Sequence, residues 1–309
     1  AWAHVRAQPG GLLRTAYGVL VGDSKLVMEV FRNSHDHYSV RGYGSRMAAS
    51  IGLGYLGQDA DSGHGQQAHD INAAIESISE AEGFEKAYGI ARTLLARLRA
   101  GGQAQAQVQQ APEVLIDLER LSEEVMAQLC RRWFGLPNGQ QMWGNERHDA
   151  SEPKAPRCPR DFVAVSRYVF GPQPTRRVEK GGQAAGEALQ RAARHWLDSK
   201  PDLSQLPLVQ AILKAVEPLK QAGDTSIAER TLAGIMLGFP PTVHGNLLTA
   251  LMAWVSTRKL WDLQLLWPIA PADPFAESQR RLRPILLRTL MARPQPAMVW
   301  REAKCDHQL

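Results

Sequence analysis

The sequence has little cysteine and lacks the short motifs that identify several common enzyme classes. Its 309 residues include three cysteines, Cys130, Cys158 and Cys305, and none of them has the spacing of a paired motif. Unpaired cysteines indicate reduced thiols and predict a cytoplasmic protein. The chain also has no glycine-rich phosphate loop, no His-Glu-x-x-His, no Cys-x-x-Cys and no Gly-x-Ser-x-Gly. Because its histidine pairs are loosely arranged as well, we predict no metal held by protein ligands.

Strong charge of one sign is missing too, and so is a long uninterrupted apolar run. The net charge is +5, and the arginines are scattered rather than massed, so we predict no nucleic-acid surface. The most apolar segment, residues 227–255, carries Pro240, Pro241, His244 and Asn246 near its centre. These residues argue against a membrane span and for a helix inside a protein core.

The most informative feature is the break in this apolar segment, at Gly238-Phe239-Pro240-Pro241-Thr242. Apolar residues on both sides recur near the 3.6-residue spacing of a buried helix. Two prolines inside such a helix would remove backbone donors and clash with the preceding turn. The pattern therefore predicts that the helix is interrupted to make room for another group at this point. Two helices joined by a Pro-Pro turn are the simpler explanation.

The rest of the chain predicts a mainly α protein with minor β, in a single domain over residues 1–309. A short strand is expected near 17–21, and residues 294–301 are expected to form a turn that leads into a strand. Ser24 is expected to cap the first helix. Residues 101–110 are rich in Gly, Ala and Gln and predict an exposed linker that ends near 112. Helices are expected at 24–31, 66–98, 118–134, 160–170, 183–198, 206–222 and 276–292. On the amphipathic helix before Gly135, Glu123 and Glu124 are expected to face water.

Read in order, several segments resemble the haem-thiolate cytochromes, the cytochrome P-450 superfamily, in its bacterial form. The segments are Tyr17 to Phe31, His37-Tyr38-Ser39-Val40, Tyr43-Gly44-Ser45-Arg46-Met47, Leu56-Gly57-Gln58-Asp59 ahead of His64, Leu115 to Pro137, residues 225–255, and Arg293-Pro294 with Val299-Trp300-Arg301. Their order over nearly the whole chain is more specific than any one match. The resemblance implies a cytochrome P-450-like helical fold.

The resemblance also implies a haem cofactor and the residues around it. Gly238 and Thr242 would lie over the distal face of the porphyrin, while His64 and Arg301 would lie near its propionates. The iron-binding cysteine would come after Leu309, so the chain looks truncated before that loop. Cys305 has the wrong neighbours for this ligand.

The sequence departs from the family at the position of proton delivery. Pro240 and Pro241 fall near the usual acid-alcohol pair and leave only Thr242, while Asn246, one turn later, would present an amide. Glu277 and Arg280 fit the family's Glu-x-x-Arg spacing but lie too far upstream. Weak proton delivery favours a peroxide or lipid hydroperoxide as the source of oxygen over a reductase-fed monooxygenase.

Two functions of different classes therefore stay open. One is a haem-thiolate oxidoreductase of the monooxygenase family, acting on an apolar small molecule or lipid, with a redox partner in its reductase-driven form. The other is a haem-free helical binding or structural protein, or an inactive fragment without the thiolate. The site residues have plainer roles in the second case: Asn246 would bond a backbone carbonyl, Thr242 would cap a helix and Arg301 would be a surface charge.

Overall fold

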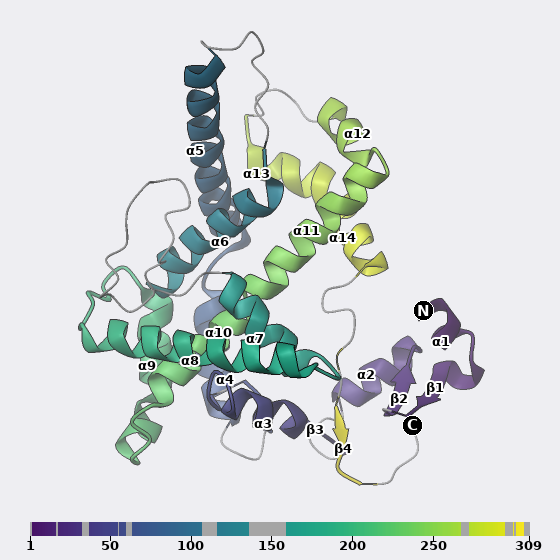
Figure 1. Cartoon of the computed structure of the whole chain (residues 1–309), viewed down its shortest axis with the longest axis vertical. Helices are drawn as coiled ribbons and strands as arrows, with labels where there is room; N and C mark the ends of the chain where they lie inside the picture. Colours follow the sequence, from purple (N-terminus) through teal and green to yellow (C-terminus); the bar gives the residue numbers. More distant parts are fainter. Residues whose placement is uncertain are drawn as a thin grey trace.

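The computed structural model describes residues 2–16, 18–32, 37–54, 56–59, 64–106, 116–135, 159–266, 272–293, 299 and 301–305. The protein is mainly helical with two small sheets, as the sequence predicted (Figure 1). The helices are α1 Trp2–Arg6, η1 Pro9–Gly11, α2 Ser24–Arg32, α3 Arg41–Ala48, α4 His64–Glu76, α5 Glu80–Ala106, α6 Leu118–Phe134, α7 Arg160–Phe170, α8 Arg176–Asp198, α9 Pro207–Gln221, α10 Ile227–Gly238, α11 Pro240–Ser256, α12 Lys259–Leu266, α13 Pro274–Glu277, the π-helical turn η3 Ser278–Leu282 and α14 Arg283–Ala292. The strands are β1 Leu12–Thr15, β2 Gly18–Val21, β3 Tyr38–Ser39 and β4 Glu302–Ala303.

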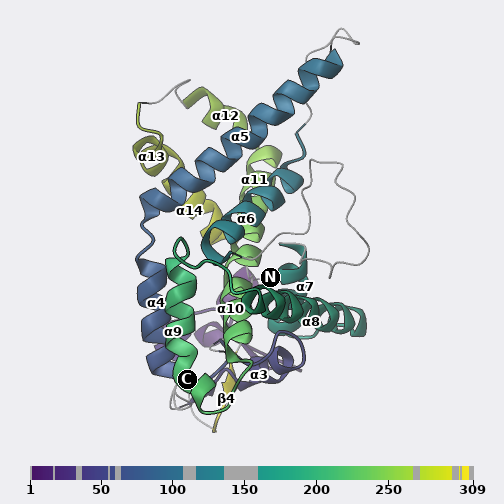
Figure 2. The ribbon, with the colours of Figure 1, turned by 90° about the vertical axis from the view of Figure 1, so that its left-hand side faces the viewer.

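Helix α10 forms the centre of the main core. Its residues from Ile227 to Leu237 are buried, with Arg230 the partial exception. A helix that is apolar on nearly every side has to be covered on every side. Helices α9, α8 and α7 supply this cover, and Figure 2 shows α10 between α9 and the α7–α8 pair. The largest fully buried side chain of the described core is Phe162, on α7.

Both sheets are antiparallel pairs of short strands. Strand β2 confirms the strand expected near 17–21, and its partner β1 was not predicted. Strand β4 pairs with β3, with Tyr38 opposite Ala303 and Ser39 opposite Glu302. The strand expected to follow the turn within residues 294–301 begins at Glu302, while residues 294–298 and 300 lie outside the described part. This pairing brings the segment around Val40 next to the segment around Arg301.

Two local predictions are wrong. The cap of α2 is Asp23 rather than Ser24, because Asp23 Oδ1 accepts hydrogen bonds from Lys25 N at 2.8 Å and Leu26 N at 3.0 Å. The linker predicted from residue 101 is helical up to Ala106, where α5 ends. Alanine and glutamine are good helix formers, so they extend a helix that has already formed. The remaining linker residues, 107–112, lie outside the described part.

The expected helix at 66–98 is two helices, α4 and α5, and the other helices lie close to their predicted positions. The prediction for Glu123 and Glu124 is wrong, because both side chains are buried on α6. Arg160 Nε donates to Glu123 Oε1 at 2.7 Å, and Gln128 Nε2 donates to Glu124 Oε1 at 3.0 Å. Burial of a carboxylate is tolerated where such partners are present.

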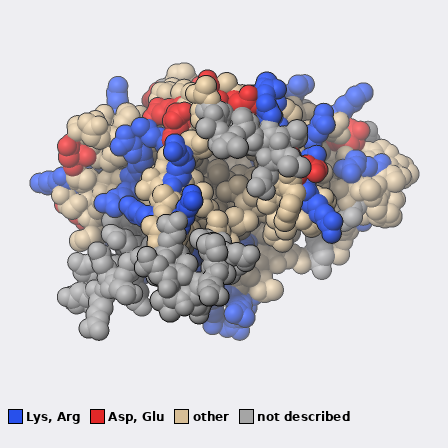
Figure 3. Space-filling model, turned by 90° about the horizontal axis from the view of Figure 1, so that it is seen from above, with Lys and Arg blue, Asp and Glu red and all other residues tan. Residues whose placement is uncertain are grey.

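Two observations concern the apolar length of the helices and the distribution of charge. Within the described residues, none of the helices combines the length and apolarity needed to span a bilayer. On the face shown in Figure 3, lysine and arginine side chains are spread over the surface rather than gathered in one patch.

Candidate functional site

The break between α10 and α11 is a one-residue kink at Phe239, whose backbone angles, φ −96° and ψ −69°, still lie in the right-handed helical region. Pro240 and Pro241 occupy the first two positions of α11. A proline is well tolerated there, because the first N–H groups of a helix have no intrahelical acceptor. The backbone therefore forms two separate helices, as in the simpler explanation, but both prolines belong to α11 rather than to a turn between the helices. Phe239 packs against Trp133 and Phe134, with ring centroids 5.4 and 6.2 Å away.

A cavity of about 360 Å³ lies beside this kink, and we call it the kink cavity. Its size falls within the range of small-molecule sites, about 300–1,000 Å³. The described residues that line it are Val40, Tyr43, Met47, Leu56, Gly57, Ser166, Phe170, Leu237, Gly238, Pro241, Thr242, Val299 and Arg301. Most are apolar, and Tyr43, Ser166, Thr242 and Arg301 add polar groups. Three residues predicted for the site, Gly238, Thr242 and Arg301, thus line one cavity.

Arg301 is the one charged side chain among the described residues that line the kink cavity. It is half-buried, and its guanidinium lies 4.8 Å from the ring centre of Phe31 and 5.9 Å from that of Tyr43. Aromatic faces attract a guanidinium and limit its motion. The alternative of an exposed strand charge is therefore wrong, and a positioned cation lies at the edge of the cavity.

The wall formed by β3 and α3 is held by the carboxylate of Asp59. Ser39 Oγ donates to Asp59 Oδ2 at 2.6 Å, and Val40 N donates to Oδ1 at 2.9 Å. Burial alone would raise the pKa of Asp59, but these hydrogen bonds and the charges of Lys304 and Arg41 together outweigh it, and the pKa lies below its ordinary value. The segment Tyr43 to Met47, which carries part of the resemblance, lies within helix α3. Its Arg46 donates to the carbonyls of Tyr168 and Val169, both at 3.3 Å, which joins α3 to the end of α7.

Asn246 is not among the described residues that line the kink cavity. Its Nδ2 donates to the backbone carbonyl of Thr242 at 2.9 Å, as the plainer alternative for this residue predicted. Thr242 is the third residue of α11, and the N-cap position belongs to Phe239. The capping role considered for Thr242 is therefore wrong, and its side chain borders the cavity instead.

The remaining predicted residues contribute less. His64 is the first residue of α4, and its side chain lies outside the described part of the structure. Cys130 is buried in the main core, and exposed Cys305 lies with Sγ 3.7 Å from His37 Nδ1. Neither lines the kink cavity, and Cys158 lies outside the described residues.

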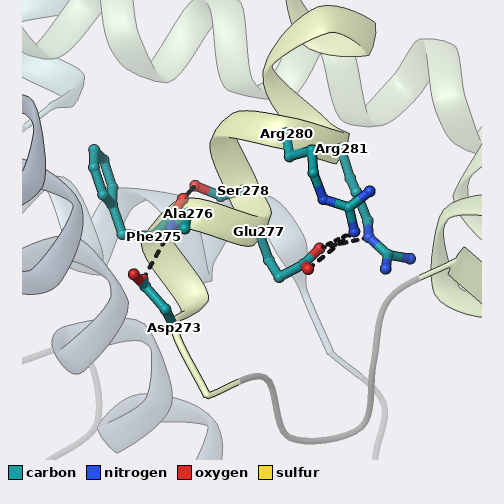
Figure 4. A network of polar contacts seen from close by, with 7 residues as sticks. All are labelled: Asp273, Phe275, Ala276, Glu277, Ser278, Arg280 and Arg281. Carbon is teal, nitrogen blue, oxygen red and sulfur yellow. Dashed lines mark hydrogen bonds and ion pairs between the residues drawn. The ribbon is translucent and has the colours of Figure 1, made fainter.

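The Glu-x-x-Arg pattern at Glu277 forms a local ion pair away from the kink cavity. Arg280 Nη2 donates to both carboxylate oxygens of Glu277 at 2.9 Å, and Arg281 bonds the same carboxylate (Figure 4). The bond from Arg280 is the main reason that the pKa of Glu277 lies below its ordinary value. This pair holds the start of the α13–η3–α14 segment, where Asp273 Oδ1 also accepts a hydrogen bond from Ala276 N at 3.0 Å.

The residues of the kink cavity fit part of a haem. An added Cβ on Gly238 would meet only Leu56 Cδ1, at 3.9 Å, so the glycine leaves open space that a flat ring can approach. Apolar walls suit a porphyrin face, and Arg301 suits a propionate. No cysteine is among the described lining residues, so they do not supply the thiolate ligand.

Sequence reasoning missed Ser166 and Phe170, which α7 contributes to the kink cavity. Phe170 packs edge-on against Tyr43, with ring centroids 5.2 Å apart. Only the packing of α7 on α3 brings them to the site, so no sequence pattern could reveal them. Searches against protein-family models, curated proteins and solved structures found no significant match to this chain.

Proposed function

We propose that the kink cavity binds haem and that this chain forms the haem-distal part of a haem-thiolate oxidoreductase acting on an apolar small molecule. One observation carries the proposal. Gly238 and Thr242 on one segment and Arg301 on another, all expected near the cofactor, border the same cavity of about 360 Å³. The sequence resemblance supplies the identity of the cofactor. The cavity supports it by its apolar walls and by Arg301, the one cation among its described lining residues.

Each of these residues has a chemical part in the proposal. Gly238 leaves room for a flat ring, and Arg301 attracts an anionic edge by a charge-assisted hydrogen bond. Thr242 presents a hydroxyl that can orient a water or an oxygen-containing substrate. When bound, a haem iron with a thiolate ligand supplies cleavage of the O–O bond. The thiolate would come from a cysteine that is not among the described lining residues.

Haemin titration of the purified chain tests the cavity directly. We expect saturable binding, followed by absorbance of the Soret band, that Gly238→Leu blocks by filling the cavity. Arg301→Ala should weaken binding about tenfold or more, because a hydrogen bond to a charged group contributes about 1.5–3 kcal/mol. The matched controls are Gly181→Leu, at an open position of α8, and Arg132→Ala, on the exposed side of α6. Binding that responds equally to the variants and to their controls would contradict the proposal.

The thiolate has its own test. Carbon monoxide added to the reduced, haem-loaded protein should give the Soret shift of a thiolate ligand when the cysteine is supplied. A histidine-type spectrum would contradict a haem-thiolate enzyme while leaving haem binding in place.

The prolines at the start of α11 favour a peroxide as the oxygen source. Pro240 and Pro241 offer no proton and no N–H near Thr242. The amide of Asn246 is bonded to the Thr242 carbonyl, so proton delivery by Asn246 has no support from its geometry. Turnover of a lipid hydroperoxide without an electron donor would support this form, and activity only with a reductase partner would refute it.

A second candidate is a haem-free binding protein for an apolar anion such as a fatty acid. The absence of cysteine among the described lining residues favours it, because Arg301 and apolar walls suit a carboxylate with a hydrocarbon chain. Displacement of a fluorescent fatty acid by palmitate, with no effect of haemin, would favour this candidate over the first.

A further inference from the structure

A buried polar cluster lies between α6 and α11, away from the kink cavity. His244 comes two residues after Thr242, which is about 200° around a helix, so it faces the other side of α11. Its Nδ1 lies 2.8 Å from Ser122 Oγ on α6. Glu119, Ser122 and Glu123 share one face of α6, since residues three and four apart are neighbours on a helix surface.

The cluster contains three side chains able to bind a metal ion. One ligand atom from each of Glu119, Glu123 and His244 lies within 4.8 Å of the other two. Glu123 and His244 are 3% and 6% exposed, whereas Glu119 is exposed. The buried pair is thus fixed by its surroundings, and Glu119 stands at the open side where an ion can enter.

The two buried side chains already have the supporting contacts that metal ligands need. Arg160 Nε donates to Glu123 Oε1 at 2.7 Å and leaves Oε2 for a further partner. When Nδ1–H of His244 donates to Ser122 Oγ, the ring is held in the tautomer that keeps a lone pair on Nε2. Partners behind the ligands orient metal-binding side chains in this way in known sites.

The charges in the cluster also suit a cation. Among the described residues of the cluster, the two carboxylates stand against one arginine, Arg160, so these three side chains carry a net negative charge between two packed helices. His244 is buried, which disfavours the charged imidazole, and the neutral imidazole is the form that binds metals. A divalent ion would balance the excess charge.

We propose that Glu119, Glu123 and His244 form a site for one Zn²⁺ ion that ties α11 to α6. Two carboxylates and an imidazole leave a fourth, water-accessible position of the tetrahedral ion. The imidazole favours a transition metal over Mg²⁺ or Ca²⁺. Zinc bonds of about 2.0–2.2 Å bring tetrahedral ligands to about 3.4 Å from one another. The three ligand atoms, which lie within 4.8 Å of one another, would draw closer around the ion, and the exposed Glu119 has room to rotate toward it. The ion would fix the first turns of α11, which carry Pro241 and Thr242. The site is independent of any cofactor in the kink cavity.

Zinc titration of the metal-stripped chain, followed by calorimetry and thermal melting, tests the site. We expect one Zn²⁺ per chain and a rise in melting temperature. Glu119→Gln keeps the fold because Glu119 is exposed, and it should weaken zinc binding about tenfold or more. His244→Gln should weaken zinc binding to a similar extent. The matched controls, Glu85→Gln on α5 and His195→Gln on α8, replace exposed residues of the same kinds and should bind zinc like the unaltered protein.

Two results would overturn the proposal. One is an absence of saturable zinc binding by the unaltered chain. The other is binding that Glu119→Gln leaves unchanged, which would place the ion elsewhere. Cobalt(II) in place of zinc identifies the donor atoms: the expected spectrum has d–d bands without thiolate charge-transfer bands, whose presence would assign the ion to cysteines.

Discussion

Removal of the Asp59 carboxylate should destabilise one wall of the kink cavity. Asp59 holds Ser39 Oγ and Val40 N, at the junction of β3 and α3. In Asp59→Ala, both donors lose their acceptor. Because Ser39 is only 4% exposed, water is a poor substitute for the lost carboxylate. Tyr43 and Met47 follow within two turns of α3 and line the cavity. We therefore expect a loss of stability together with a loss of ligand affinity.

The size of the loss follows from these contacts. A hydrogen bond to a charged group contributes about 1.5–3 kcal/mol, and the two bonds share one carboxylate, so we expect Asp59→Ala to cost about 3 kcal/mol. The nearby Arg41 adds little, because its Nε is 3.9 Å from Asp59 Oδ2 and its side chain is 82% exposed.

Urea unfolding, followed by far-UV circular dichroism, measures this change. The matched control is Asp202→Ala, which removes an exposed carboxylate that also accepts one backbone and one hydroxyl hydrogen bond, both from Ser204. The control should change the free energy of unfolding far less. Equal effects of the two variants would refute the reasoning that burial makes the Asp59 bonds strong.

Three other perturbations have clear expected results. As pH falls from about 5 to 3, the stability gap between the unaltered protein and Asp59→Asn should narrow in urea melts, because a carboxyl with a lowered pKa stabilises the fold above its unfolded pKa and loses this effect as it is protonated. Gly186→Ala should lower the melting temperature, costing about 1–3 kcal/mol, because its Cβ would lie 2.5 Å from the Ser50 carbonyl carbon. In Gly181→Ala, on the same helix, the added Cβ meets nothing within 4 Å, and the variant should be more stable by about 0.5–1 kcal/mol. Stability changes of the same sign in the two glycine variants would contradict this reasoning. Phe162→Ala should cost about 3–5 kcal/mol in urea unfolding, since the ring is fully buried, and a smaller cost would indicate collapse of the core around it.

Local backbone chemistry made part of the fold predictable. The prolines at 240 and 241 fix the boundary between α10 and α11, because they fit only the first positions of a helix. Gly135 ends α6 with φ +69°, a conformation that glycine adopts without strain. Such positions depend on the nearest neighbours in the sequence, so they can be recognised without the tertiary structure.

Other features depend on partners that are distant in the sequence. Glu123 is buried because Arg160, 37 residues later, reaches it. Residues 101–106 are helical because α5 extends through them, whereas their composition suggested a linker. In the candidate site, Gly238, Thr242 and Arg301 came from the ordered resemblance, while Ser166 and Phe170 needed the packing of α7 on α3. Composition and periodicity contain no information about these contacts.

The pairing of β3 with β4 has a consequence for the order of folding. Tyr38 and Ala303 are far apart in the chain, and a contact that closes so long a loop forms slowly. During synthesis on the ribosome, helices α4 to α11 can emerge and pack while β4 is still inside the exit tunnel. Arg301, next to β4, reaches Phe31 and Tyr43 only afterwards. The wall of the kink cavity that contains Arg301 is therefore completed only after β4 has paired with β3.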